Sequence, residues 1–214
     1  PASREFRTTR KQENSCVFRR TAKPSLCARA GSPNTMPHPF TIASAPRPDG
    51  TLTFCIRGLG GWTRSLPAIL RTGTRVQVEG PYGWFNFRKG GARQIWLAGG
   101  IGITPFLAWA ESLTEAESRD IHLIYCVPTQ EEAIGVETLR AAAARNPRFS
   151  FEVVVTTRDG RLTAERLIGA VPFAIRQADL WFCGPTGLKD GILKGLKAQG
   201  QTPRRVRFEQ FEFT

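Results

Sequence analysis

The chain has 214 residues, of which 41% are hydrophobic and 22% charged, as is ordinary for a soluble globular protein. All apolar runs are much shorter than the roughly 18 residues that a membrane helix needs, so the composition excludes a membrane-spanning chain. The net charge of +12 invites a nucleic-acid interpretation. However, the excess is concentrated near the N-terminus and no stripe of aromatic and basic residues follows it, so nucleic acid is excluded as a partner.

Residues 1–36 are basic and rich in Arg, Ser and Thr, without apolar periodicity. We expect an unassigned, disordered segment here. The chain begins with Pro1 instead of Met, which indicates a fragment, a processed product or an incomplete sequence. An Arg-rich, acid-poor start is also typical of a transit peptide, although this pattern has little force without a true start.

Residues 37–91 are predicted to form part of an antiparallel β-barrel. Short alternating segments separated by turn residues are typical of such a domain. The predicted elements are strands at Phe40–Ala43, Leu52–Arg57 and Arg75–Glu79, a turn at Pro48–Gly50 and a short helix at Ser65–Leu70.

Residues 92–214 alternate strand and helix patterns, which predicts a doubly wound parallel sheet with crossover helices. Thr129–Glu132 resembles a capping box that opens a helix toward Ala144. The predicted strands are Gln94–Ala98, Ile121–Tyr125, Phe151–Thr156, Leu180–Cys183 and, as a last strand or extended tail, Val206–Phe213. The fold class is therefore α/β plus β.

A glycine-rich turn separates the first of these strands from a helix. Gly99, Gly100 and Gly102 allow a ligand to approach the backbone closely, because they have no Cβ atom. Thr104 is a natural N-cap and Pro105 a natural first helical residue, so a helix N-terminus could receive a pyrophosphate here. The alternative is a tight turn without a ligand, since the spacing is not that of the dinucleotide fingerprint.

The number and spacing of the cysteines and histidines argue against disulfide bonds and a metal-binding site. The five cysteines are scattered without a C-x-x-C pair, and the two histidines are isolated. The pattern suits a reducing compartment, and we expect no metal site.

Five motifs occur in an order that resembles the ferredoxin-NADP reductase superfamily. They are His38–Ser44, Gly80–Gly83, Leu97–Pro105, Cys183–Pro185 and Phe208–Thr214. The HPFT sequence at residues 38–41 resembles most the cytoplasmic dehydrogenase module of ferric reductases and NADPH oxidases. The resemblance covers residues 38–214. It implies an oxidoreductase that transfers hydride from NADPH or NADH to FAD and passes single electrons to a haem, ferric iron or a redox protein such as an iron–sulfur protein.

The resemblance implies a set of flavin-binding residues. Phe40 would stack on the flavin ring, Thr41 would bond near its reactive nitrogen, and His38 would lie toward the phosphates or ribityl chain. Pro39 is assigned to the same cofactor site. The second flavin loop would contribute Arg57, Gly61, Trp62 and Thr63 to the pyrophosphate site. Without a bound flavin, the first motif would be one face of a barrel strand. The second motif would be a glycine-rich hairpin with a surface arginine.

The resemblance also implies the nicotinamide-binding residues. Gly99, Gly100, Gly102 and Thr104 would bind the cofactor, and Cys183, followed by Gly184 and Pro185, would flank the carbon that gives up hydride. Arg161 would meet the adenosine phosphate end. Pro128 stands where many relatives have Arg, so the preference for NADPH over NADH stays open. The alternative for Cys183 is a buried structural residue.

The implied catalytic residues are Thr41, Cys183 and Phe213. Phe213 would stack on the flavin where the nicotinamide later lies, with Phe211 as the alternative.

The sequence also departs from the family. A Pro-Gly-Gln-Phe segment and several barrel strands are expected before residue 38 and are not recognised, so we expect weak FAD binding.

A complete protein with a membrane haem domain would place this module on the cytoplasmic face of the membrane; otherwise we expect a cytoplasmic chain. The alternatives are a soluble ferredoxin-type reductase and a non-enzymatic remnant of the fold.

Overall fold

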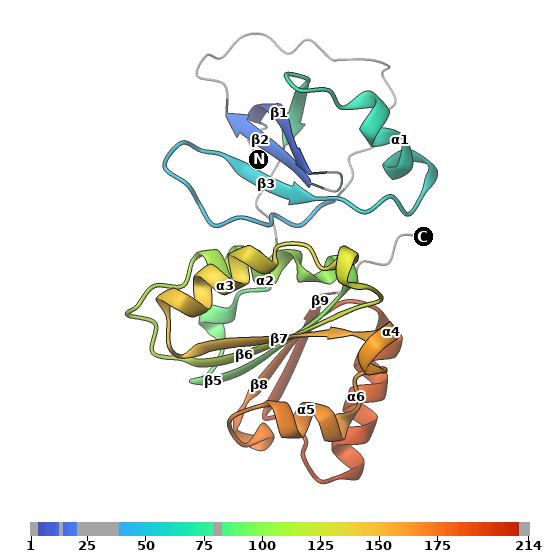
Figure 1. The fold of residues 1–214 in the computed structure, drawn as a ribbon. Helices are drawn as coiled ribbons and strands as arrows, with labels where there is room; N and C mark the ends of the chain where they lie inside the picture. Colours follow the sequence, from blue (N-terminus) through green and yellow to red (C-terminus); the bar gives the residue numbers. More distant parts are fainter. Residues whose placement is uncertain (1–3, 13–14, 21–38, 79–82, 210–214) are drawn as a thin grey trace. The chain divides into compact units, whose positions relative to one another are not determined.

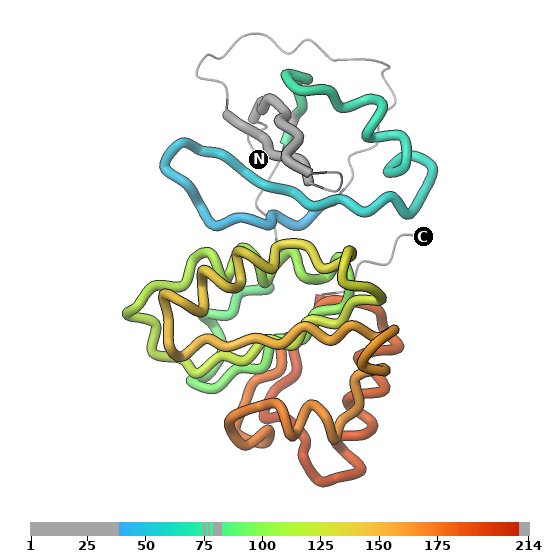
Figure 2. The backbone as a smooth tube through the Cα atoms, viewed as in Figure 1, coloured from blue at the N-terminus to red at the C-terminus, as the bar shows by residue number. Residues whose placement is uncertain are grey.

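The computed structural model describes residues 4–12, 15–20, 39–78 and 83–209, with the backbone alone for residues 4–12, 15–20, Arg75 and Gln77. The chain divides into two compact units, residues 1–83 and 84–214 (Figure 2). The sequence places this boundary after residue 91. The structure places it earlier because Phe85 and Phe87 pack into the core of the second unit.

The first unit contains a four-stranded antiparallel sheet with the order β3-β2-β1-β4 (Figure 1). Helix α1 connects β3 to β4 along the chain. Phe54 is the buried centre of a small apolar cluster to which both β3 and β4 contribute. The elements are β1 (Arg4–Gln12), β2 (Ser15–Arg20), β3 (Leu52–Cys55), α1 (Gly61–Ile69) and β4 (Arg75–Val78).

The expectation of an unstructured start is wrong for residues 4–12 and 15–20. These residues form β1 and β2, which lie between β3 and β4 in the sheet. Local periodicity does not reveal them because arginines occupy many of their positions. Their hydrogen-bonding partners are supplied by strands that are remote in sequence, which a local pattern cannot show.

The second unit is a five-stranded parallel sheet with the order β7-β6-β5-β8-β9. Its strands are β5 (Arg93–Gly99), β6 (Asp120–Val127), β7 (Phe149–Val155), β8 (Asp179–Cys183) and β9 (Arg205–Glu209). Its α-helices are α2 (Thr104–Glu111), α3 (Val136–Arg145), α4 (Thr156–Asp159), α5 (Ala164–Ala170) and α6 (Thr186–Ala198). Short 3-10 helices lie at Phe87–Lys89, Gly100–Ile103, Gln130–Glu132 and Ile175–Gln177.

Helices cover both faces of this sheet, as the prediction of a doubly wound sheet requires. Helices α2 and α3 pack on one face around Trp96, Trp109 and Trp181, and α5 and α6 pack on the other around Leu97 and Phe182 (Figure 1). The strands are buried on both sides, which explains their nearly continuous apolar sequences.

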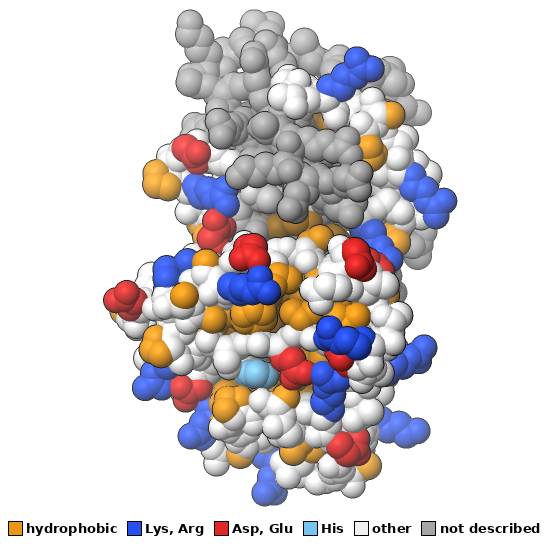
Figure 3. All heavy atoms as spheres, in the orientation of Figure 1, with side chains coloured by type: hydrophobic (Ala, Val, Ile, Leu, Met, Phe, Trp, Pro, Cys, Tyr) orange, Lys and Arg blue, Asp and Glu red, His pale blue; other side chains and the backbone are white. Residues whose placement is uncertain are grey.

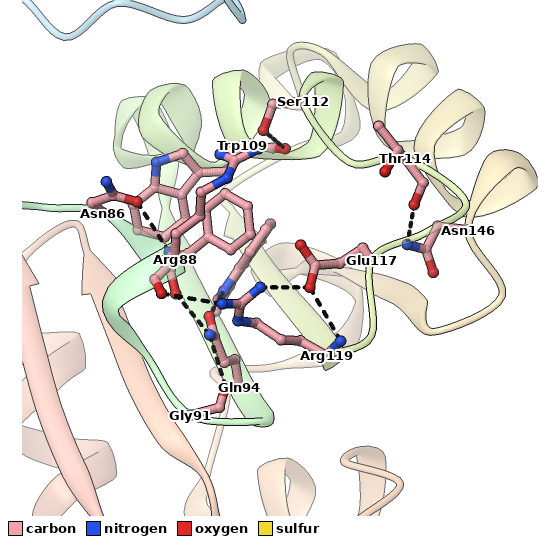
Figure 4. A network of polar contacts seen from close by, with 12 residues as sticks. Asn86, Arg88, Gly91, Gln94, Trp109, Ser112, Thr114, Glu117, Arg119 and Asn146 are labelled. Atoms are coloured by element: carbon pink, nitrogen blue, oxygen red, sulfur yellow. Dashed lines mark hydrogen bonds and ion pairs between the residues drawn. The ribbon is translucent and has the colours of Figure 1, made fainter.

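A polar network fixes the start of β5. Nε2 of Gln94 donates to the carbonyl oxygens of Phe87 and Gly91 at 2.8 and 3.0 Å. Its Oε1 accepts from the indole nitrogen of Trp96 at 3.0 Å. Figure 4 shows how Arg119 joins this network through the carbonyl oxygen of Arg88, at 3.1 Å. The buried amide thereby ties the segment before β5 to the core.

Two local predictions need correction. Thr129 does not cap a helix with its side chain; α3 begins later, after Gly135 in the left-handed conformation with φ 71°. A glycine suits that conformation, and it interrupts the helix that the capping box predicts. The predicted strand at Phe40–Ala43 reduces to a single bridge between Ile42 and Phe54.

Among the described residues, no helix is both long enough and apolar enough to cross a membrane. Within the same part of the chain, no group of three His, Cys, Asp or Glu side chains is placed to hold a metal ion.

Candidate functional site

The strand order of the second unit reverses between β5 and β8. From β5 the chain proceeds outward to β6 and β7, then returns to the other side of β5 to form β8 and β9. Ala98 lies opposite Cys183, so the carboxyl ends of β5 and β8 meet at one edge of the sheet. Ligands of open α/β sheets bind outside the carboxyl ends of the strands at such a reversal. The topology therefore selects the turns after β5 and β8 as the candidate nucleotide site.

These two turns pack against each other through their backbones. A Cβ atom on Gly99 would lie 2.7 Å from Cδ of Pro185, and one on Gly184 would lie 2.8 Å from the backbone nitrogen of Gly99. A Cβ atom on Gly102 would collide with the carbonyl oxygen of Cys183. The structure therefore brings together the two motifs that the sequence analysis assigned to the nicotinamide cofactor.

The glycines also have a role that the sequence analysis did not assign. Gly99 and Gly102 permit the contact between two parts of the protein, whereas the prediction explained them by ligand approach alone. Gly100 adopts the left-handed conformation with φ 54°. The sequence analysis also did not connect Leu188 with this turn. Its side chain would lie 3.2 Å from a Cβ atom on Gly99. Its apolar, helical spacing indicates only a core residue.

Thr104 is not the N-cap that the sequence predicts. It is helical, because the 3-10 helix at Gly100–Ile103 continues directly into α2. Its hydroxyl donates to the carbonyl oxygen of Ile101 at 3.2 Å, and the residue is 2% exposed.

Helix α6 begins directly after the Cys183–Pro185 turn and has no acidic residue in its first turn. Its N-terminus is therefore a second candidate for binding phosphate at this edge.

Cys183 is fully buried among the apolar residues of the face that α2 and α3 cover. Burial raises the pKa of its thiol, and the nearby Glu209 carboxylate raises it further. A neutral buried thiol is a poor nucleophile. The side chain is therefore part of the apolar core, and its assigned position beside the nicotinamide stays a prediction.

The loops after β6 and β7 lie at the same edge of the sheet. The carbonyl oxygen of Pro128 accepts hydrogen bonds from the backbone nitrogen and hydroxyl of Thr157, at 3.2 and 2.9 Å. Hydrogen bonding to Arg158 lowers the pKa of Asp159 to about 2, with a further contribution from the backbone of Val155. Arg161 is exposed in the loop that follows Gly160. Arg158 is thus paired with a carboxylate, which leaves Arg161 as the better candidate for a phosphate.

In the first unit, the two predicted flavin motifs meet. The rings of Phe40 and Trp62 stack with centroids 6.0 Å apart and an interplanar angle of 17°. Trp62 is 37% exposed. Thr41 is half-buried beside Phe40, whereas Pro39 and Arg57 are exposed. A planar aromatic ligand could extend this stack.

The glycine loop before α1 is held by Thr63. Its hydroxyl oxygen accepts from the backbone nitrogens of Leu59 and Gly60, both at 3.0 Å. A Cβ atom on Gly60 or Gly61 would meet nothing within 4 Å. Protein packing therefore does not require these glycines, and the space beside them is open at a helix N-terminus without acidic residues. The loop is therefore a candidate site for a pyrophosphate, and the Thr63 hydroxyl makes hydrogen bonds within the loop itself.

Several predicted residues lie outside the described residues. They are His38, Gly80, Pro81, Tyr82, Phe211 and Phe213. Their assigned roles stay predictions.

His122 is a buried histidine remote in sequence from these motifs. It is 7% exposed, and its Nδ1 lies 2.8 Å from the hydroxyl of Ser150. Its Nε2 is buried without a hydrogen-bond partner among the described residues. Burial lowers the pKa of His122, although the charge of Glu152 works in the opposite direction.

We expect stability to fall as the pH drops below about 6.5, the ordinary pKa of histidine. The unfolded chain takes up the His122 proton first, because the folded-state pKa is lower. Urea midpoints measured across this range should show a smaller pH dependence for His122→Gln than for the parent chain. Identical pH dependences would contradict the prediction.

Two family models match the chain. A model described as an oxidoreductase NAD-binding domain matches residues 96–193, and one described as an FAD-binding domain matches residues 32–86. The first includes the turns after β5 and β8, and the second includes the stacked aromatic pair and the glycine loop.

Two relatives from Pseudomonas putida are similar to most of this chain. The electron transfer component of toluate 1,2-dioxygenase from Pseudomonas putida is 30% identical over 188 residues, which are 85% of this chain and 55% of that protein. Vanillate O-demethylase oxidoreductase from the same species is 37% identical over 153 residues, which are 71% and 46% of the two chains. The chain thus spans about half the length of these relatives.

Solved structures share the fold. The flavohem-like FAD/NAD-binding domain of nitric oxide dioxygenase from Vibrio cholerae has a TM-score of 0.76 at 18% identity and covers 97% of this chain and 98% of its own. A ferredoxin NADP+ reductase from Neisseria gonorrhoeae with bound FAD and NADP has a TM-score of 0.74 at 18% identity, with 98% of each chain covered.

The fold and the two matched domains define an oxidoreductase that binds FAD and a nicotinamide cofactor. The chain contains the oxidoreductase NAD-binding domain and the FAD-binding domain that the two models describe, and its fold is similar to that of a ferredoxin NADP+ reductase.

Proposed function

We propose that this chain is the NAD(P)H-oxidising reductase module of an oxygenase system and that it delivers electrons to an iron–sulfur or oxygenase partner. The observation that carries the proposal is the contact between the turns after β5 and β8, at the strand reversal where α/β sheets bind nucleotides. The acceptor class is suggested by the printed functions of the two Pseudomonas relatives.

Residues of the first unit would bind the flavin. Phe40 and Trp62 would hold its ring, with Thr41 beside them, and the open space at Gly61 would receive the pyrophosphate near the Arg57 guanidinium. His38 and Pro39 keep the roles that the resemblance implies. When bound, FAD supplies the conversion of a two-electron hydride into single electrons.

Residues of the second unit would bind and orient the nicotinamide cofactor. The Gly99–Gly102 and Gly184–Pro185 turns would line its pyrophosphate, Cys183 would form an apolar wall, and Arg161 would serve the adenosine phosphate end. Alignment of the two cofactors is the main catalytic contribution, because it makes hydride transfer effectively intramolecular.

A ferric or haem acceptor is the second candidate, and the HPFT motif at residues 38–41 favours it. Stopped-flow oxidation of the NADH-reduced, FAD-loaded chain by a [2Fe–2S] ferredoxin and by ferric citrate distinguishes the two. Faster oxidation by ferredoxin supports the oxygenase-type reductase, and faster oxidation by ferric citrate supports the second candidate. A chain without a flavin absorption spectrum after incubation with FAD would contradict both and favour a non-enzymatic remnant.

The flavin site makes a direct prediction. Trp62→Ala should weaken FAD binding about tenfold, because aromatic stacking contributes about 0.5–1.5 kcal/mol beyond apolar burial. Fluorescence titration with FAD measures the effect. Ile69→Ala is the matched control, since Ile69 is an exposed apolar residue at the end of the same helix. Equal FAD affinities for the two variants would show that Trp62 is not part of the flavin site.

A further inference from the structure

The two edges of the parallel sheet in the second unit carry charge of opposite sign. The amino edge consists of the first residue of each strand and the segments that precede the strands. These segments are residues 84–92, 112–119, 146–148, 171–178 and 199–204. The amino edge contains eight Lys and Arg against four Asp and Glu. The carboxyl edge, formed by the last residue of each strand and the loops after β5, β6, β7 and β8, contains two against four. The basic excess therefore lies at the end of the sheet remote from the candidate nucleotide site.

Half of the basic residues at the amino edge have a polar partner. Three of them form ion pairs with Glu117, Asp120 and Asp179, and Arg93 donates to the side chain of Gln177. The other four are exposed, and none of them forms an ion pair within the part of the chain that the structure describes. The unpaired cations, as we call them, are Arg88, Lys89, Arg176 and Arg205.

The unpaired cations lie at the beginnings of three neighbouring strands. Arg88 and Lys89 precede β5, Arg176 precedes β8, and Arg205 is the first residue of β9. In the sheet, β8 lies between β5 and β9 and is parallel to both (Figure 1). The buried carboxylate of Asp179 accepts hydrogen bonds from the segment before β5 and from the segment before β9. Because adjacent strands are about 4.8 Å apart, the four cations belong to one small region of the edge.

This concentration of charge is local. Residues 84–214 contain seventeen Lys and Arg against fourteen Asp and Glu, a net charge of only +3. On the face drawn in Figure 3, basic and acidic side chains of the second unit are interspersed. Four neighbouring cations without carboxylate partners therefore call for an anionic partner outside the chain.

An exposed tryptophan adjoins the unpaired cations. Trp84 is 86% exposed, more than any other large hydrophobic side chain in the described part of the chain. Nζ of Lys89 lies 4.4 Å from the centroid of its ring. The next residue, Phe85, stacks on Trp109 with the ring centroids 4.8 Å apart, so the backbone that carries Trp84 is anchored in the core. An aromatic ring with a cation on its face suits the headgroup layer of a membrane, where tryptophan is enriched.

We propose that Trp84 and the unpaired cations form a docking surface for anionic phospholipid headgroups. Guanidinium groups pair with phosphate in bidentate geometry. A basic residue near an anionic bilayer strengthens binding about fivefold. A protein partner matches this surface less well, because the anchor residues of protein interfaces fill packed pockets, whereas Trp84 is almost entirely exposed. The candidate nucleotide site is at the other end of the sheet, so lipid and nucleotide would not compete.

Sedimentation of the full chain with vesicles of phosphatidylglycerol and phosphatidylcholine tests the proposal. Arg176→Gln/Arg205→Gln should weaken binding about 25-fold at low salt, about fivefold for each arginine removed. Binding by the parent chain should fall steeply as the salt concentration rises. Arg140→Gln/Lys194→Gln is the matched control, because it removes two exposed charges from the middles of α3 and α6, outside the amino edge. Arg176→Lys/Arg205→Lys, which keeps the charges, should retain most of the affinity.

The tryptophan is tested by a separate pair of variants. Trp84→Ala should weaken vesicle binding several-fold, because its ring adds apolar contact with the headgroup layer. Phe208→Ala is the matched control. Phe208 is 52% exposed, and Nζ of Lys189 lies 4.1 Å from the centroid of its ring, but it is located near the carboxyl end of β9. Phe208→Ala should bind vesicles like the parent chain.

No binding to phosphatidylglycerol vesicles at low salt, equal binding to pure phosphatidylcholine vesicles, or equal affinities of the edge and control variants would overturn the proposal. So would binding of an acidic ferredoxin or duplex DNA that depends on the unpaired cations, in the absence of vesicle binding. If Arg176→Gln/Arg205→Gln does not fold, Arg88→Gln/Lys89→Gln removes the other two unpaired cations and takes its place. Vesicle binding requires neither cofactor nor turnover, so the test does not depend on the proposed function.

Discussion

Gly102→Ala is expected to destabilise the chain by about 1–3 kcal/mol, the cost of forcing one extra methyl into a packed site. The new Cβ atom would collide with the carbonyl oxygen of Cys183 and lie 2.8 Å from the backbone nitrogen of Gly184. A backbone neighbour cannot rotate away as a flexible side chain can. The turns after β5 and β8 must therefore separate, which also disturbs the candidate nucleotide site.

Urea unfolding of the full chain measures this effect. Gly191→Ala is the matched control in the same unit, because a Cβ atom on Gly191 of α6 meets nothing within 4 Å. Replacing a glycine inside a helix by alanine should stabilise the chain by about 0.5–1 kcal/mol. The two substitutions add the same methyl group, but they should change the free energy of unfolding in opposite directions. A Gly102→Ala chain as stable as the parent would show that the two turns do not pack as described.

Asp179→Asn is expected to lower the free energy of unfolding by about 2–3 kcal/mol at neutral pH. This is less than the effect of breaking a fully buried ion pair, because the arginine partners of Asp179 are partly exposed. Asp179 is fully buried. Its carboxylate accepts from the backbone nitrogen of Gly91 at 2.8 Å, from Nε of Arg204 at 2.9 Å and from Arg207 at 3.3 Å. An amide would leave two guanidinium groups without their negative partner.

The pH dependence of Asp179 follows from the same contacts. Burial acts to raise the pKa of this carboxyl group, but the hydrogen bonds from Gly91 and Arg204 and the charges of both arginines together lower it. The stabilisation is therefore present above about pH 4, the ordinary pKa of aspartate, and is lost as the pH falls through the lower folded-state pKa.

Thermal or urea unfolding at neutral and acidic pH compares Asp179→Asn with Asp190→Asn. Asp190 is the matched control because its side chain is 65% exposed and lies 3.7 Å from Lys189. Loss of such a surface pair should change stability by no more than about 0.5 kcal/mol. A similar, small effect of both substitutions would contradict the role assigned to Asp179.

The fold class of the second unit can be predicted from the sequence. Strong apolar runs predict β5, β6, β7 and β8, because strands buried on both faces have few polar positions. The sequence also identified the Gly99–Gly102 and Cys183–Pro185 turns as candidates. It could not assign β1 and β2, because their arginine-rich sequences show no periodicity and their partners are remote along the chain.

The packing role of the glycines and the contacts between motifs depend on tertiary contacts, which the sequence does not show. Gly102 appears in the sequence as a ligand-binding glycine, whereas the fold places it against the backbone of Cys183. Thr104 appears as an N-cap, but the preceding 3-10 helix absorbs it into α2. Phe40 and Trp62 stack although they come from separate motifs. Such contacts depend on how strands pair and turns pack over long sequence separations, which local propensity and spacing do not encode.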